Sequence, residues 1–294
     1  MTCLVPRISG ASASRDTVAR WTPKRRAATF GRRVYNDTNE RNLIRIDNLE
    51  EALYRVYALD RFEELLAGGH DALVNPTKWE DPFENFFLEA TEVIDDPSGR
   101  TVPLKNLAAD WYGQCWSTQE ESDAMWCIYS SDPNRMGTDR RKMGVKVKTT
   151  VKKLFDNLKR AGSTAPYLQF FVGRVNYKTE AEITALMNTL TFRDGSFGGQ
   201  GDKFADLLCI KREAFQHEQE VRLLFQDIEP KHGAEKLFKY RLDANVIFEE
   251  AVLDPRLKNG DAIALQSKLR AAGCTLPIWR SPLYQAPHFV IPIQ

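Results

Sequence analysis

Apolar and polar residues alternate along this chain with two periods, one typical of strands and one typical of helices. Aromatic and β-branched side chains dominate residues 53–57, which predicts a short strand. Apolar residues then recur at helical spacing, and Asp60 and Glu63 have the spacing of a capping box. We therefore expect a helix with Asp60 as its N-cap that is ended by Gly68-Gly69.

Two further elements are predicted in the middle of the chain. Residues 143–149 alternate apolar and charged side chains, which indicates a half-exposed strand with Lys146 and Lys148 directed outward. Thr179 and Glu182 form another capping box, so a second amphipathic helix is expected to begin there.

The last third of the chain contains the strongest strand pattern, from His217 to Phe225. Its period of two places Glu218, Glu220 and Arg222 on one face and apolar residues on the other. A strand, a helix and a second strand are predicted after it, within residues 248–279.

This mixture of strands and helices predicts the α+β class. Residues 1–42 show no sustained period and are rich in Arg, so we expect a basic, flexible N-terminal extension there. Residues 43–294 are expected to form a single α+β domain.

Charge is distributed unevenly, although the 294 residues carry a net charge of only +1. Residues 1–46 hold ten Lys and Arg against three Asp and Glu, a balance of +7 (10 − 3). Residues 135–160 hold ten against two, a balance of +8 (10 − 2). Such basic zones attract phosphates, so nucleic acid is a candidate partner. The alternative is that the lysines in 135–160 form an ordinary solvated face.

Composition also excludes some classes of site. The five cysteines include no C-x-x-C pair and the four histidines show no ligand spacing, so we expect neither a disulfide framework nor a bound metal. No apolar run approaches the ~20 residues that cross a bilayer. We expect a cytoplasmic protein with no membrane partner.

Several short motifs occur in a distinctive order along the chain. They are Leu53-Tyr54-Arg55, the loop from Asn75 to Glu84, Cys115-Trp116-Ser117, Trp126 to Tyr129, Glu218 to Arg222, and Ser281 to Tyr284. In this order they resemble the bacterial family catalogued as domain of unknown function 2971. The resemblance spans about residues 50–285 and departs from the family at Trp79-Glu80, where Phe-Asn is more frequent, and at 135–143, which is longer than usual.

A more distant resemblance concerns activity. Arg55 on a first strand, Ser117 in a W-S-T segment and Glu220 on a late strand follow the order of landmarks in the Arg-Ser-Glu class of ADP-ribosyltransferases. That resemblance implies a split, mixed β-sheet with flanking helices. It also implies transfer of ADP-ribose from NAD to a protein or nucleic acid.

The chemistry of that reaction suits these residue types. Breaking the bond between nicotinamide and ribose places positive charge on the sugar, which a fixed carboxylate stabilises. Glu220 is the candidate, and it would also accept a hydrogen bond from the ribose 2′-hydroxyl. Glu218 would deprotonate or orient the acceptor. The forked guanidinium of Arg55 would hold the diphosphate or the ribose of NAD.

The resemblance assigns other residues to the two substrates. Ser117 would join the first two elements by hydrogen bonding, and Trp126 or Tyr129 would stack on nicotinamide. The full donor-binding set is Tyr54, Arg55, Ser117, Trp126 and Tyr129, and the acceptor-binding set is Glu84, Lys146, Lys148 and Arg222.

Alternatives remain for these residues and for the whole chain. The E-x-E-x-R motif also fits a solvated strand face, Arg55 also fits an ion pair with Glu84 or Glu220, and Trp126 with Tyr129 has the spacing of a packed helix face. The leading hypothesis is an ADP-ribosyltransferase acting as a toxin or phage-defence effector, with an antitoxin or regulatory protein as a candidate partner. The rivals are a non-catalytic nucleotide- or nucleic-acid-binding module and a metal-independent hydrolase of nucleic acid that uses paired carboxylates.

Overall fold

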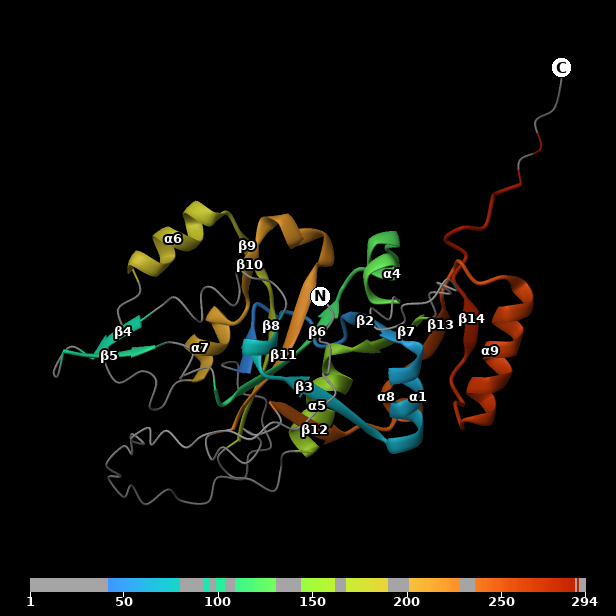
Figure 1. Cartoon of the computed structure of the whole chain (residues 1–294), viewed down its shortest axis with the longest axis horizontal. Coiled ribbons are helices and arrows are strands. Elements are labelled where there is room, and N and C mark those ends of the chain that lie inside the picture. Colours follow the sequence, from blue (N-terminus) through green and yellow to red (C-terminus); the bar gives the residue numbers. More distant parts are fainter. Residues whose placement is uncertain are drawn as a thin grey trace, which may run out of the picture.

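The computed structural model describes residues 42–79, 92–95, 99–103, 109–130, 144–161, 168–189, 201–227, 236–288 and 290. Nearly all of the expected N-terminal extension lies outside these residues, and so do Glu84 and the basic stretch 131–143. The described part combines a large sheet with helices on both faces (Figure 1). The prediction of an α+β fold is confirmed, while the division at residue 42 stays a prediction.

A ten-stranded mixed sheet forms the centre of the fold, in the order β1-β8-β11-β6-β2-β7-β13-β14, with β3 joining β6 to β12. The pairs β1–β8 and β13–β14 are parallel and the other pairs are antiparallel. Its strands are β1 (Leu43–Ile44), β2 (Ala52–Ala58), β3 (His70–Val74), β6 (Trp111–Ser117), β7 (Gly144–Thr150), β8 (Leu168–Arg174), β11 (Glu220–Asp227), β12 (Leu237–Arg241), β13 (Glu250–Leu253) and β14 (Ile278–Arg280).

Two small sheets and the helices complete the described part. The small sheets pair β9 (Asn176–Lys178) with β10 (Ile210–Arg212) and β4 (Glu92–Asp95) with β5 (Arg100–Pro103). The helices are α1 (Leu59–Gly68), α4 (Asp123–Tyr129), α5 (Val151–Ala161), α6 (Glu180–Thr189), α7 (Gly201–Leu207), α8 (Ala244–Ile247) and α9 (Asn259–Ala271), with 3-10 helices η2 (Pro76–Lys78) and η4 (Glu213–Glu218). None of these helices is long and apolar enough to cross a membrane.

The large sheet divides at β6, which confirms the expectation of a split sheet. β6 pairs with β11 from Trp111 to Ser117, but it meets β2 through the pair Tyr54–Ser117 and β3 through the pair Val74–Gly113. Two sets of strands therefore diverge from β6, and the gap between β2 and β6 is where a site can form.

The two faces of the sheet are buried to different extents. One face packs against α1, α5, α8 and α9 in the main hydrophobic core, which includes Phe62, Phe155 and Leu269. The other face carries two smaller clusters, one under α7 with Trp111 and one under α4 with Trp126. Figure 1 shows α1, α5 and α8 below the sheet and α4 above it.

The capping predictions had mixed outcomes. Thr179 and Glu182 form the expected box, because the Glu182 carboxylate accepts from the Thr179 backbone N at 2.8 Å and the Thr179 hydroxyl accepts from the Glu182 N at 3.2 Å. The box at Asp60 is wrong, since α1 begins at Leu59 with Ala58 as an N-cap that has no side-chain bond. The helix ends as predicted at Gly69, in the left-handed conformation with φ of 63°.

The prediction of a half-exposed strand at 143–149 is also wrong. Strand β7 is buried on both faces, and Lys146 is only 6% exposed. The reason is that α4 and the segment leading into it cover the face that sequence periodicity assigned to solvent. Lys148, two residues further along, remains partly exposed.

The strand predicted from His217 is shorter than expected. Residues Glu213–Glu218 form η4, and Gln219 follows in the left-handed conformation with φ of 43°, so β11 begins at Glu220. Glu218 therefore does not share a strand face with Glu220. The later strand, helix and strand are confirmed as β13, α9 and β14.

Two carboxyl groups lie at the ends of β6 and β11 that are remote from Ser117, and they predict that the free energy of unfolding depends on pH. Asp110 precedes β6 and Asp227 ends β11; burial, then the charge of Asp227, raises the pKa of Asp110 to about 6. A carboxyl group with a raised folded-state pKa destabilises the fold once it ionises, so stability falls as the pH rises from ~4 to ~6. Asp110→Asn should raise the free energy of unfolding by about 1 kcal/mol at neutral pH, after discounting for its partial exposure, and change little near pH ~4.

Urea unfolding of the Asp110→Asn variant at the two pH values measures this effect. Asp47→Asn, at an exposed position, is the matched control. Equal stability of Asp110→Asn and the unaltered chain at neutral pH would contradict the prediction.

Candidate functional site

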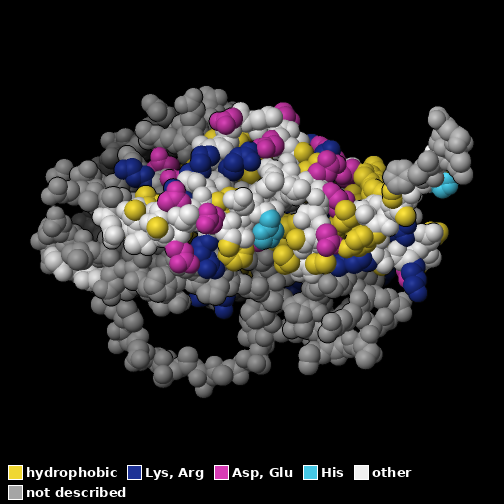
Figure 2. All heavy atoms as spheres, turned by 90° about the horizontal axis from the view of Figure 1, so that it is seen from above, with side chains coloured by type: hydrophobic (Ala, Val, Ile, Leu, Met, Phe, Trp, Pro, Cys, Tyr) yellow, Lys and Arg dark blue, Asp and Glu magenta, His cyan; other side chains and the backbone are white. Residues whose placement is uncertain are grey.

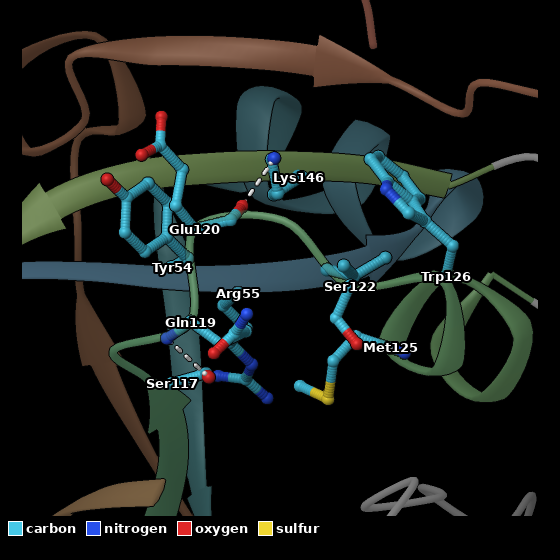
Figure 3. Close-up of a pocket in the computed structure, with 10 residues that line it drawn as sticks. Tyr54, Arg55, Ser117, Gln119, Glu120, Ser122, Met125, Trp126 and Lys146 are labelled. Carbon is cyan, nitrogen blue, oxygen red and sulfur yellow. Dashed lines mark hydrogen bonds between the residues drawn. The ribbon is translucent and has the colours of Figure 1, made fainter. Parts of the chain in front are cut away.

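A pocket opens where β2 and β6 meet, bounded by α4 and by the segment 118–122 that leads into it (Figure 3). It is a shallow pocket that opens to solvent, and the space of about 240 Å³ between its walls includes open solvent. Five residues of the predicted site line it together. The lining residues are Tyr54, Arg55, Val56, Ser117, Gln119, Glu120, Ser122, Met125, Trp126 and Lys146.

Ser117 lies at the centre of the site because it pairs with both neighbouring strands. It is opposite Tyr54 on β2 and opposite Glu220 on β11. Directly paired residues project to the same face of a sheet, so these three form a row across three strands. The Ser117 hydroxyl donates to the Glu218 carbonyl at 2.6 Å and accepts from the Gln119 backbone N at 3.0 Å. One residue thus joins the pocket to both glutamates.

The carboxylate of Glu220 is buried among cations and is 3% exposed. Its Oε2 accepts from Lys211 Nζ at 3.0 Å and its Oε1 accepts from Arg222 Nε at 2.9 Å. Burial alone would raise the pKa of Glu220, but Arg222 and Lys211 together lower it below the ordinary value. Glu220 is therefore an ionised carboxylate at neutral pH.

Lys211 also connects Glu220 to Glu218. Its side chain is completely buried, its Nζ donates to Glu218 Oε2 at 2.6 Å, and it lies 4.9 Å from the centre of the Phe215 ring. The turn of η4 brings Glu218 back to β10, where Lys211 resides. We refer to Lys211, Glu218, Glu220 and Arg222 as the buried charge cluster.

The expected role of Arg222 in acceptor binding does not fit its position. The residue is 1% exposed, its guanidinium covers the Trp79 ring at 4.3 Å, and it donates to the Leu208 carbonyl and to Glu220. Because β11 is buried on both faces, Arg222 lies in the interior behind Glu220 and presents no group to an approaching acceptor.

Arg55 reaches the site from the other face of the sheet. It follows Tyr54 on β2, and its guanidinium lies 4.8 Å from the Tyr57 ring, 5.8 Å from the Trp116 ring and 3.7 Å from Asp71 Oδ2. It lines the pocket as well, because β2 and β6 separate next to the Tyr54–Ser117 pair. Arg55 and Glu220 thus approach Ser117 from opposite faces, and the structure gives no ion pair between them.

A buried polar network surrounds Arg55. The Asp71 carboxylate accepts from the Tyr57 hydroxyl at 2.7 Å and from the Gln114 amide at 2.8 Å. The carbonyl end of Gln114 accepts from the Trp116 indole at 2.9 Å and the Tyr240 hydroxyl at 3.0 Å. These bonds fix the wall against which Arg55 lies.

Lys146 lies inside the pocket, not on the surface where an acceptor-binding residue was expected. Its Nζ donates to the Glu120 carbonyl at 2.6 Å and to Glu121 Oε2 at 3.0 Å. The Tyr54 and Trp126 rings are centred 5.8 and 5.7 Å from the same ammonium. Lys146 is therefore grouped with the predicted donor-binding residues (Figure 3).

The two aromatic residues of α4 differ in position. Trp126 is 1% exposed, packs with Val56 and Val252, and has one edge at the pocket. Tyr129 is partly buried against the same cluster and does not line the pocket. This is the packed helix face that the spacing also allowed, so stacking of nicotinamide on either ring stays a prediction.

Two acceptor-binding candidates remain apart from the pocket. Lys148 lies further along β7, with its Nζ 4.0 Å from Glu249 Oε2. Glu84 falls outside the described residues.

Sequence reasoning missed Lys211 and Glu121. Glu121 accepts bonds from the Trp126 indole, Lys146 and the Ser281 hydroxyl, and although burial would raise its pKa, these bonds lower it. For Lys211 the sequence shows only that it directly follows the apolar run 207–210, which is a weak signal of burial. For Glu121 the sequence shows only that it precedes Ser122, the N-cap of α4.

Metal binding has no support in the described part of the chain. No three His, Cys, Asp or Glu side chains group there in a way that holds an ion.

Comparisons with known proteins give only distant likenesses. No family model and no curated protein matches the chain, so membership in family 2971 stays a prediction. Among solved structures, Thermus sp. 2.9 DarT in complex with NAD+ is 10% identical, with a TM-score of 0.35 over 80% of this chain and 96% of that one. The same protein in complex with carba-NAD+ is 10% identical, with a TM-score of 0.32 over 79% of this chain and 96% of that one. In complex with ADP-ribosylated ssDNA it is 9% identical, with a TM-score of 0.35 over 79% of this chain and 94% of that one. Likeness at this level transfers no activity, so function must follow from this chain's own residues.

Proposed function

We propose that this chain is an ADP-ribosyltransferase that takes NAD as its donor. The observation that carries the proposal is the row Tyr54–Ser117–Glu220 across β2, β6 and β11. It places a pocket with aromatic and cationic walls on one side of Ser117 and an ionised carboxylate on the other. The order Arg55, Ser117, Glu220 seen in the sequence thus corresponds to three neighbouring central strands.

In the proposed reaction the bond between ribose C1′ and the nicotinamide nitrogen breaks. Its electron pair leaves with nicotinamide, which departs as a neutral molecule, and positive charge develops on the ribose. The ionised Glu220 stabilises that charge, an effect that preorganised groups supply most strongly in a dry site. An acceptor nucleophile then bonds to C1′ and gives up its proton, and Glu218 is proposed to orient it or take the proton.

The buried charge cluster explains how Glu220 stays ionised in a dry environment. Two cations and the fold hold it in place, and a low pKa keeps it deprotonated. The same property argues against the hydrolase alternative with Glu220 as the proton donor, because a general acid needs a raised pKa.

The burial of Glu220 favours one rival, a non-catalytic module that binds a nucleotide in the same pocket. A carboxylate that is 3% exposed and bonded to two cations resembles a structural ion cluster. The two candidates differ in one outcome, since a module binds NAD without cleaving it.

For the acceptor we propose a nucleic acid or a protein, reached through the basic zones 1–46 and 135–160. In the described part, Lys152 and Lys153 of the second zone pair with Asp156 and Glu249. Figure 2 shows Lys and Arg interspersed with Asp and Glu on the face it presents. This face is a mixed surface, so acceptor binding is assigned to the two zones as a proposal. A role as a toxin or phage-defence effector in the cytoplasm, with an antitoxin partner, belongs to the same proposal.

Incubation with NAD labelled in its adenine, together with single-stranded DNA, RNA or cytoplasmic protein, tests this function. Label is expected to become covalently attached to one class of acceptor. Binding of NAD without attachment to any acceptor would favour the module. Cleavage of nucleic acid without NAD would favour the hydrolase.

A further inference from the structure

Lys146 is a buried cation that faces the pocket with donor capacity to spare. Its side chain is 8% exposed, and it lines the pocket. An ammonium has three donor hydrogens, and the structure gives this one two acceptors within the described chain, the Glu120 carbonyl and Glu121 Oε2. One hydrogen therefore remains for an oxygen atom of a ligand.

The charges around the pocket favour an anionic ligand group. Two cationic side chains, Arg55 and Lys146, line it, while their partners Asp71 and Glu121 are not among its lining residues. Glu120 also lines the pocket; its carbonyl is bound to Lys146, and its carboxylate points away from Arg55 and Ser117 (Figure 3). A positively charged pyridinium ring would be repelled by Lys146, whereas a phosphate would be attracted to it.

We propose that Lys146 makes this pocket a phosphate subsite. This assignment rests on the proposed function, in which the ligand is NAD, and it places the diphosphate of NAD at Lys146. The charged nicotinamide ring then lies away from Lys146, toward Glu220 on the far side of Ser117. Trp126 and Tyr54 act as the apolar walls that keep water from the ammonium.

Calorimetric titration with ADP-ribose, inorganic pyrophosphate and nicotinamide tests the subsite without any catalytic step. Lys146→Met is expected to weaken binding of ADP-ribose and of pyrophosphate by about tenfold or more, the loss typical of one charge-assisted hydrogen bond. Binding of nicotinamide should not change. Lys268→Met, which removes the same charge from an exposed position on α9, is the matched control and should bind ADP-ribose as the unaltered chain does.

Loss of folding must be separated from loss of binding, because Lys146→Met leaves Glu121 without its cation. The double variant Lys146→Met with Glu121→Gln removes both charges, and it should fold and still bind ADP-ribose weakly. Wild-type affinity in either variant would overturn the subsite, as would failure of ADP-ribose to bind the unaltered chain. If binding depends on Lys146 while NAD is never cleaved, the subsite stands and the transferase proposal fails. If NAD is cleaved but Lys146→Met binds ADP-ribose normally, the transferase proposal stands and the phosphate subsite fails.

Discussion

Glu220→Gln is expected to lower the rate of nicotinamide release from NAD by about 100- to 1,000-fold, the range for removing one preorganised group from a transition state. The amide keeps the size of the side chain but loses the charge that, in the proposed reaction, stabilises the ribose cation. Binding of NAD should change much less, because the charge matters most after the bond begins to break. Steady-state kinetics that separate kcat from KM measure this difference.

A matched control is needed because Glu220 belongs to the buried charge cluster. Glu213→Gln removes a carboxylate from the exposed start of η4 and should leave the rate unchanged. Circular dichroism and urea unfolding must show that Glu220→Gln is folded at the assay temperature. A folded Glu220→Gln variant with wild-type turnover would show that this carboxylate is structural and would end its assignment to catalysis.

Lys211→Met is expected to destabilise the fold by about 3–5 kcal/mol, the usual result of breaking a buried ion pair from one side. Its ammonium lies between Glu218 and Glu220, at 2.6 and 3.0 Å from their carboxylate oxygens. Without it, two acidic groups would remain buried with Arg222 as the cation of the cluster that still contacts Glu220. Urea unfolding monitored by tryptophan fluorescence measures the loss.

A double variant tests whether the loss of stability comes from the unbalanced buried charge. Lys211→Met combined with Glu218→Gln removes one positive and one negative charge, so it should recover part of the lost stability. Lys203→Met, on the exposed side of α7, should cost less than about 1 kcal/mol. A loss below about 1 kcal/mol for Lys211→Met itself would mean that water or another cation already screens the two carboxylates.

Much of the fold was predictable from local signals of composition and spacing. Strand β2, helix α6 with its Thr179 box, and the β13–α9–β14 unit follow patterns that depend on near neighbours in the sequence. The class of the fold and the split of the sheet were also expected.

The site was predictable only in part, since its geometry depends on non-local contacts. Periodicity assigned Lys146 to solvent, but α4 covers that face of β7 and buries it. The E-x-E spacing suggested two glutamates on one strand face, yet the left-handed Gln219 breaks the strand between them. Lys211 then joins the pair from β10, a contact that no spacing in the sequence reveals.

The position of Arg55 shows the same limit. Its order in the chain relative to Ser117 and Glu220 was correct, and the three residues do occupy neighbouring strands. Which face of β2 its side chain leaves depends on the register with β6 and β7, and this places it with Asp71. Order along the sequence therefore identified the strands but not the side-chain contacts.

The central claim is that a ligand bound at the Ser117 row is cleaved with Glu220 as the stabilising charge. The most direct test uses NAD labelled in its adenine. It measures both the nicotinamide that is released and the label that becomes attached to an acceptor, for the unaltered chain and for Glu220→Gln. The account predicts release and attachment in step for the unaltered chain and neither for the folded variant. Intact NAD after incubation of the unaltered chain with DNA, RNA and protein acceptors would contradict it.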